Sequence, residues 1–269
     1  MRCGITLPAF LEWSDPRIVV DIAGEAERAG WDGVFLWDHV TWNPAWGGTP
    51  SMADPWLCLA AAATATSRVL LGTLVTPLPR RRPQIVARQV VTLDHLSGGR
   101  AVLGVGIGED FEYEAYGEPV RARGARLDEG LEIVTRLLTG DETDFEGDHY
   151  AVHSPPSLPR PVRGTIPIWV GGHWPNQPPF ARASRYDGVV PRKIGGDLDT
   201  ADLHAIRELV GRNGGFDYVA TGSTASPKDT DGVRAWDAAG ATWWLESLHP
   251  FGGRAAAMRD RLRAGPPAL

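Results

Sequence analysis

A repeated alternation of short apolar runs with longer helical patterns constrains this chain more than any other feature. Runs rich in β-branched and aromatic residues occur eight times, each followed by a segment with apolar residues at helical spacing. The runs are CGITL, DGVFLW, RVLLGTLVT, RAVLGVGIG, IPIWVGG, VVPRKIG, FDYVATG and ATWWLESL. Apolar strands joined by helices predict a parallel sheet, and eight such units predict a closed α/β fold, the (β/α)₈ TIM barrel. An open doubly wound sheet is the competing arrangement, because strand count alone does not prove closure.

The chain shows no internal division into domains. No linker or low-complexity segment interrupts the alternation, so we expect residues 1–269 to form one barrel domain. The first two helices are predicted to begin at the pairs Asp15-Pro16 and Asp54-Pro55, where an aspartate caps and a proline opens the helix. One long, proline-containing interruption covers residues 141–165, and we expect a loop or hairpin near the barrel mouth there.

The overall composition limits the possible partners and surroundings. The formal net charge is −6, and no lysine- or arginine-rich tail occurs, which argues against nucleic acid as a partner. The two cysteines form no C-x-x-C motif and are typical of free thiols in a reducing compartment. The first residues lack the apolar core of a signal peptide, and no apolar run is long enough to span a bilayer. We therefore expect a soluble cytoplasmic protein with no membrane partner.

No histidine and cysteine cluster has metal-ligand spacing, so a bound metal is not expected.

The stretch VLGVGIGED, residues 102–110, suggests at first a phosphate-binding dinucleotide turn. Its glycines do not fit the G-x-G-x-x-G spacing, and Glu109 and Asp110 place negative charge where a pyrophosphate would lie. In a (β/α)₈ barrel the same stretch is a strand end facing the active site. The glycines, Gly106 among them, would then let a flat ligand approach the backbone.

Polar and aromatic residues collect where the predicted strands end. The polar residues are Glu12, Asp38, His39, Thr73, Thr76, Glu109, His173, Arg192, Lys193, Thr221, Ser223, Glu246 and His249. Four tryptophans lie close to the same ends, namely Trp42, Trp46, Trp174 and Trp244. A pocket lined by tryptophan with a few polar groups suits a planar aromatic ligand. Each residue also has a structural interpretation: His39 can cap its strand, Glu109 can be a solvated loop carboxylate, and the tryptophans can be packing residues.

Three stretches resemble the luciferase-like flavin-dependent oxidoreductases, which include bacterial luciferase, alkanesulfonate monooxygenase and the coenzyme F420-dependent reductases and dehydrogenases. They are GWDGVFLWDHV, LLGTLVTPLPRRRPQIVARQVVTLDHLSGGRAVLGVGIGED and IPIWVGGHWPN. The resemblance runs from Gly4 to about Leu248. It implies a barrel that binds a reduced flavin or deazaflavin at the carboxyl ends of its strands.

The resemblance also implies roles for individual positions. Asp38 and His39 match an acid and histidine pair beside the isoalloxazine ring, and Glu109 matches an acid of some F420-dependent members. Thr73 and Leu74 match a bulge that often carries a non-proline cis peptide behind the ring. We therefore predict such a bond at or beside Thr73–Leu74.

Further positions are predicted to contact the cofactor. Gly171 and Gly172 match a backbone turn near the cofactor phosphate, and Gly106 and Trp42 are expected to contact the ring. Lysines that hold a phosphorylated sugar in related dehydrogenases have no clear counterpart. The long insertion of bacterial luciferase is absent too, which argues against light emission.

From these features we expect a monooxygenase that acts on a small organic substrate with reduced FMN and O₂. A separate flavin reductase would supply the reduced FMN. His39 would act as acid or base, with Asp38 fixing its tautomer, and the tryptophans would exclude water. The alternative is an F420-dependent hydride-transfer reductase or dehydrogenase, in which Glu109 or His39 manages the substrate proton. Two other classes remain: a barrel glycosidase using Glu109 and Glu246, and a flavin-binding protein without turnover.

The choice of cofactor depends on its anionic groups. The single phosphate of FMN needs only the Gly171–Gly172 amides and the start of the following helix. F420 adds a phosphodiester and a polyglutamyl tail, which need a basic track such as Arg80–Arg82 with Arg192 and Lys193. Because FMN needs fewer anion-binding groups than F420, the sequence favours FMN.

Family members commonly dimerise through their second and third helices, and the small apolar residues of PWLCLAAAATAT suit close helix packing, so a homodimer is expected.

Overall fold

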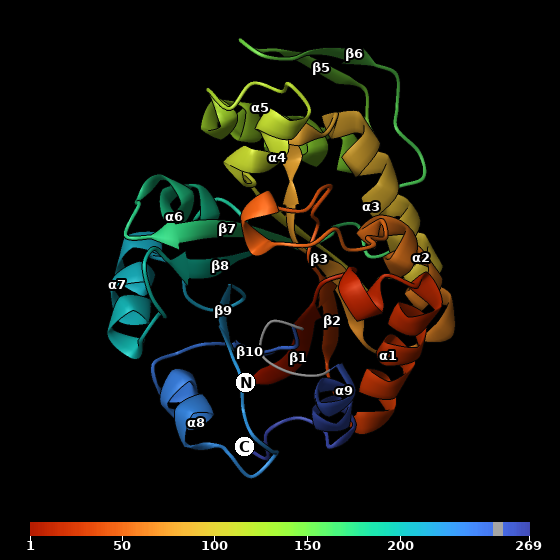
Figure 1. The fold of residues 1–269 in the computed structure, drawn as a ribbon. Coiled ribbons are helices and arrows are strands. Elements are labelled where there is room, and N and C mark those ends of the chain that lie inside the picture. The colour runs from red at the N-terminus through yellow and green to blue at the C-terminus, as the bar shows by residue number, and fades with distance from the viewer. Residues whose placement is uncertain (250–254) are drawn as a thin grey trace.

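A closed barrel of parallel strands forms the centre of the molecule (Figure 1). The computed structural model describes residues 1–249 and 255–269. Within these residues eight strands pair in chain order, and the last pairs with the first. They are β1 (Arg2–Leu7), β2 (Gly33–Leu36), β3 (Leu70–Pro77), β4 (Ala101–Gly106), β7 (Ile168–Trp174), β8 (Gly188–Lys193), β9 (Asp217–Gly222) and β10 (Trp243–Ser247). The predicted TIM barrel is confirmed, and the open doubly wound sheet is excluded.

Helices surround the barrel on its outer side (Figure 1). The α-helices are α1 (Pro16–Ala29), α2 (Pro55–Ala65), α3 (Pro83–Ser97), α4 (Asp110–Ala115), α5 (Arg123–Leu138), α6 (Pro178–Ala183), α7 (Thr200–Val210), α8 (Asp231–Ala238) and α9 (Ala255–Arg263). The described residues also form three single turns of 3₁₀ helix, η1 (Leu11–Trp13), η2 (Pro44–Trp46) and η3 (Leu78–Arg80). Both predicted Asp-Pro starts are confirmed, because Asp15 accepts a hydrogen bond from the Arg17 N–H and Asp54 accepts one from the Leu57 N–H.

Two apolar layers hold the barrel together. Seven buried residues, all from strands, pack on one another and fill the barrel interior: Phe35, Val102, Trp169, Val190, Val219, Trp243 and Leu245. The rings of Phe35, Trp169 and Trp243 lie with their centroids 5.2–5.8 Å apart. A larger layer joins the outward side chains of the strands to the inner faces of the helices. The interior is therefore a packed core, and any ligand site must lie at an end of the barrel.

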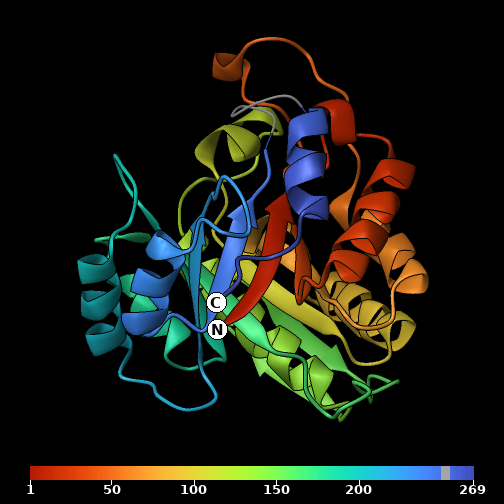
Figure 2. The ribbon, with the colours of Figure 1, turned by 90° about the horizontal axis from the view of Figure 1, so that it is seen from below.

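The predicted hairpin exists, but its predicted place near the barrel mouth is wrong. Strands β5 (Thr143–Glu146) and β6 (Ala151–Ser154) pair antiparallel outside α5, at the end opposite η2 and α4 (Figure 2). The N–H groups of residues 148–150 donate to the Glu129 carboxylate of α5. The hairpin lies at this end because it follows α5. This helix runs antiparallel to the barrel strands and ends at their amino-terminal side. The carboxyl ends of the strands are covered instead by η2 and α4.

The glycines of β4 make room for a bulge in β3. The pairing of β3 with β4 shifts register between Thr73 and Thr76. A Cβ added at Gly104 would lie 2.1 Å from the Thr73 carbonyl oxygen, and one at Gly106 would lie 2.6 Å from Val75 Cγ2. Larger residues at these two positions would collide with the bulge. The glycine-rich end of β4 therefore serves close backbone approach and not a dinucleotide turn.

Arg100, in the LSGGR stretch, ties α2 to β3 at the amino-terminal end of the barrel. Its side chain is buried, and it donates to four carbonyl oxygens, those of Ala63, Thr66, Val69 and Ser97, and to the Thr66 hydroxyl. All five N–H donors of the guanidinium are thereby used. Burial lowers the pKa of Arg100, and no carboxylate pairs with it among the described residues. This part of the family-like signature is structural.

No helix within residues 1–249 and 255–269 is long and apolar enough to cross a membrane. In the same residues no three histidine, cysteine, aspartate or glutamate side chains converge in a way that could hold a metal ion.

Candidate functional site

A cavity of about 270 Å³ opens at the carboxyl ends of the strands. Its walls come from β2, β3, β4, β7 and β8 and from the loops and helices that follow them. The lining residues are Trp37, Asp38, His39, Trp46, Leu74, Val75, Pro77, Gly106, Ile107, Gly108, Glu109, Glu112, Gly171, Gly172, His173, Asn176, Pro179, Arg182, Val190 and Arg192. Seven of the nine residues predicted for the site are among them: Asp38, His39, Leu74, Gly106, Glu109, Gly171 and Gly172.

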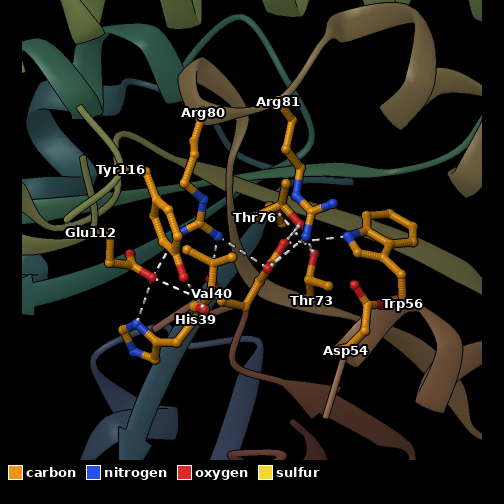
Figure 3. Close-up of polar contacts among 12 residues, drawn as sticks. His39, Val40, Asp54, Trp56, Thr73, Thr76, Arg80, Arg81, Glu112 and Tyr116 are labelled. Carbon is orange, nitrogen blue, oxygen red and sulfur yellow. Dashed lines mark hydrogen bonds and ion pairs between the residues drawn. The ribbon is translucent and has the colours of Figure 1, made fainter. Parts of the chain in front are cut away.

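Asp38 is buried and fully engaged, but not with His39. Its carboxylate accepts hydrogen bonds from the Thr76 hydroxyl at 2.8 Å and from the Trp56 indole N–H at 3.3 Å. The guanidinium groups of Arg80 and Arg81 pair with it at 3.3 and 2.8 Å (Figure 3). The expectation that Asp38 fixes the His39 tautomer is therefore wrong, because these four donors already occupy its oxygens.

The carboxylate that faces His39 belongs to Glu112, on α4. Glu112 Oε1 lies 3.4 Å from His39 Nδ1, accepts the Val40 N–H at 2.9 Å and pairs with Arg80 (Figure 3). The side chain is 1% exposed. Burial opposes its ionisation, but the contacts with His39, Arg80 and the Val40 N–H outweigh burial and lower the pKa of Glu112. Glu112 is thus ionised at neutral pH.

Sequence reasoning missed Glu112 because it considered only the acids directly after the predicted strand end, Glu109 and Asp110. The available signal was local. Glu109 occupies the N-cap position of α4, so a carboxylate three residues later, in the first turn, points toward the same end of the helix as the cap. Glu109 itself is exposed, lines the cavity and makes no cap hydrogen bond.

His39 is enclosed by aromatic rings. The ring centroids of Phe10, Trp37, Trp46 and Phe111 lie 5.9–6.3 Å from that of His39. Its Nδ1 is buried against Glu112, whereas Nε2 has no hydrogen bond to any described residue and is the nitrogen left open to the cavity. The site therefore presents one ring nitrogen of His39 to a ligand, within an apolar surround.

The bulge of β3 forms the opposite wall. The non-proline cis peptide lies between Leu74 and Val75, so the prediction of such a bond at or beside Thr73–Leu74 is confirmed. Leu74 and Val75 line the cavity, whereas Thr73 is buried behind it, where the Thr76 hydroxyl donates to the Thr73 hydroxyl at 2.8 Å. Gly106 and Gly171 both face Val75, since a Cβ at Gly171 would lie 2.9 Å from Val75 Cγ1. This wall is consequently smooth backbone and small apolar groups.

Two expectations about cofactor contacts need correction. The start of α6 was expected to offer free N–H groups to a phosphate. Its first two residues, Pro178 and Pro179, have none, and the N–H groups of Phe180 and Ala181 both donate to the Gln177 carbonyl. Trp42 does not line the cavity, because its indole donates to the Gly47 carbonyl and packs on Phe10 and Trp46.

The arginine run does not form an exposed basic track. Arg80 and Arg81 point inward and pair with Asp38 and Glu112, and only Arg82 is exposed. The cations that reach the cavity lie on the other side, on β8 and α6. Arg192 lies over the Trp37 ring at 5.6 Å, and Arg182 is held by Asp128 at 2.8 Å.

Glu246 lies outside the cavity, which removes the proposed glycosidase pair. Its carboxylate accepts hydrogen bonds from the Thr224 N–H and hydroxyl, and from the indole of Trp244. Arg261 of α9 lies 3.4 Å away, so Glu246 points to the outer side of the barrel. Glu109 and Glu246 cannot flank one substrate bond from there.

The sequence matches the family model described as luciferase-like monooxygenase over residues 1–267. The chain belongs to this family. Among curated members, it is 39% identical to an F420-dependent glucose-6-phosphate dehydrogenase of Intrasporangium calvum over 175 residues. That match covers 62% of this chain and 51% of the dehydrogenase, so the family member described here spans about half the length of that relative.

Solved structures share the fold of this family member. The F420-dependent tetrahydromethanopterin reductase of Methanopyrus kandleri matches with a TM-score of 0.77 at 16% identity, over 98% of this chain and 99% of the reductase. The monooxygenase RslO1 of Streptomyces bottropensis matches with a TM-score of 0.77 at 19% identity, over 98% of this chain and 97% of the other. These likenesses establish the luciferase-like barrel.

Proposed function

We propose that this protein is an F420-dependent oxidoreductase that moves a hydride between the deazaflavin and a small organic alcohol or carbonyl compound. The observation that carries the proposal is the open Nε2 of His39, held beside the ionised Glu112 opposite the smooth wall of the β3 bulge. Its sequence support is the similarity to F420-dependent dehydrogenases, at 36–39% identity over part of each chain.

The cavity residues fit a flat ring system. Because Gly106 and Gly171 carry no Cβ, nothing projects from the wall beside Val75, and a planar ring can lie against it. Leu74 and Val75 would contact the ring face, and Asp38 would keep Thr76 fixed behind it. A volume of about 270 Å³ suits the ring and little more. The anionic part of the cofactor would therefore lie toward the mouth, near Arg182 and Arg192.

The chemistry divides between cofactor and protein. When bound, the deazaflavin supplies a two-electron acceptor or donor of hydride. His39 Nε2 takes the proton of the substrate hydroxyl as the carbonyl forms, and returns it in the reverse direction. The rings of Trp37, Trp46 and Phe111 exclude water from this nitrogen. Glu109, also at the cavity wall, is the second group that can exchange a proton with the substrate.

A monooxygenase using reduced FMN is the competing function, and the family description together with the Streptomyces structure supports it. The argument that favoured FMN from the sequence placed its phosphate on the Gly171–Gly172 amides and on free N–H groups at the start of α6. With two prolines there, the support from the helix start is lost. We therefore prefer F420, and with it no separate flavin reductase is required.

Anaerobic turnover tests the proposal. The purified protein is incubated with oxidised F420 and a panel of secondary alcohols, sugars and sugar phosphates, glucose 6-phosphate included. We expect at least one alcohol to bleach the F420 absorbance. In a separate aerobic assay, formation of an oxygenated product from a panel member with reduced FMN, without any F420 reduction, would assign the protein to the monooxygenases. Cofactor binding without turnover on any panel member would favour a flavin-binding protein.

Homodimerisation stays a prediction, and the surface of α2 and α3 supports it. Leu57 on α2 is 73% exposed and borders a shallow apolar hollow between the two helices. We expect a two-chain mass by light scattering at micromolar concentration, and a one-chain mass for Leu57→Glu, because a charge there opposes apolar packing. Ile194→Glu, at an apolar position that is 59% exposed and lies outside α2 and α3, is the control. A wild-type monomer would refute this prediction.

A further inference from the structure

We propose that Glu112 is a positioning residue that fixes His39 in the Nδ1–H tautomer, so that Nε2 offers its lone pair to the substrate. The inference rests on the proposed function for its catalytic consequence, but the tautomer is a property of the protein alone. Asp38, the neighbour in sequence, cannot take this role because its oxygens are occupied by Thr76, Trp56 and two arginines.

The argument starts from the surroundings of His39 Nδ1. This atom is buried and makes no hydrogen bond of normal geometry to a described residue, and Glu112 Oε1 faces it at 3.4 Å as an ion-pair contact. In the Nε2–H tautomer, a nitrogen lone pair would face a carboxylate oxygen without water between them, which is unfavourable. In the Nδ1–H tautomer, the same geometry is a donor facing an acceptor. The carboxylate therefore selects the tautomer.

Glu112 is itself held in place by two further contacts to the same oxygen. Oε1 accepts the Val40 N–H at 2.9 Å, and Arg80 Nη1 pairs with it at 2.5 Å. Because Val40 follows His39 directly, Glu112 binds the backbone and the ring of one short segment at once. A rotation of the His39 side chain would break the ring contact while leaving the backbone contact intact, so the carboxylate adds a polar constraint on the ring to the packing of its aromatic neighbours.

The charges around His39 come from several elements. Arg80 and Arg81, at the end of β3, pair with Asp38, and Arg80 also pairs with Glu112. Glu109 and Arg192 face the cavity from β4 and β8. The negative charges of Asp38 and Glu112 are thus balanced by the positive charges of two arginines on the side of the His39 ring that carries Nδ1. Removing the charge of Glu112 would leave a net positive environment on this side of the ring.

The experiment compares two substitutions of Glu112 that remove different properties of its side chain. Glu112→Met removes the acceptor, whereas Glu112→Gln keeps a carbonyl oxygen and loses only the charge. Glu114→Gln, on the exposed face of α4, is the matched control. Nitrogen-15 NMR of labelled histidine reads the tautomer in the protein without cofactor, and loss of one signal in His39→Gln assigns the resonance.

We expect Nδ1–H in the wild type and in Glu112→Gln, and a mixture of tautomers in Glu112→Met. With F420 and an active substrate, Glu112→Met should lose about 10–100-fold in kcat with KM unchanged. Glu112→Gln should recover most of kcat, because its carbonyl oxygen can still accept from Nδ1–H. A wild-type His39 in the Nε2–H tautomer would overturn the inference, as would Glu112→Met with wild-type NMR signals. If F420 does not bind the wild type, the proposed function fails, while the NMR result still decides the tautomer.

Discussion

The His39→Ala variant should turn over substrate about 10²–10⁴-fold more slowly than the wild type, because it removes the one proton acceptor that the aromatic surround leaves open. The barrel should remain intact, since His39 lies at the cavity wall and not within either apolar layer. Initial rates with F420 and the best alcohol of the panel give the turnover number, and thermal unfolding gives the stability.

His204→Ala is the control for this variant, because it removes an exposed histidine from α7, a helix that contributes no residue to the cavity lining. It should leave both rate and stability unchanged. If His39→Ala lost less than about tenfold in rate with normal stability, His39 would be a capping residue and the acid–base role would pass to Glu109.

The second large effect concerns stability. Arg100→Met should lower the free energy of unfolding by about 3–5 kcal/mol, because it leaves four buried or half-buried carbonyl groups without a donor. Methionine keeps much of the side-chain volume, so the loss reports hydrogen bonding more than cavity formation. Urea unfolding followed by tryptophan fluorescence measures the change.

Arg121→Met, at an exposed position before α5, is the matched control and should change stability little. An Arg100→Met protein as stable as this control would show that water or other donors satisfy the carbonyls, and that the LSGGR stretch is not the structural tie described above.

The barrel was predictable from the sequence because its signal is repeated. Eight strand and helix units, with Asp15 and Asp54 as caps, all point to one architecture, so an error in a single unit could not change it. The cis peptide beside Leu74 came from the family resemblance and not from residue physics. The hairpin of residues 143–154 was placed at the wrong end, although it joins a helix to the next strand, and in a (β/α)₈ barrel such connections lie at the amino-terminal ends of the strands.

The pairing of charges was the part that could not be predicted. Asp38 and His39 are adjacent in sequence and both line the cavity, yet their side chains meet different partners, Arg81 and Glu112 respectively. Arg80 and Arg81 seemed exposed in a basic run but turn inward to meet Asp38 and Glu112. Which charges meet depends on the bulge of β3 and on the short helix α4, and neither has a strong local signal.

The central claim is that the cavity binds F420, and a direct binding comparison tests it. Oxidised F420 and FMN are titrated separately, and then in competition, into the same protein, with tryptophan fluorescence as the readout because Trp37 and Trp46 line the cavity. Gly106→Ala, whose Cβ would lie 2.6 Å from Val75 Cγ2, should weaken binding, whereas Gly232→Ala on α8 should not. We predict saturable F420 binding that FMN does not displace. Saturable FMN binding that F420 fails to displace would contradict the account.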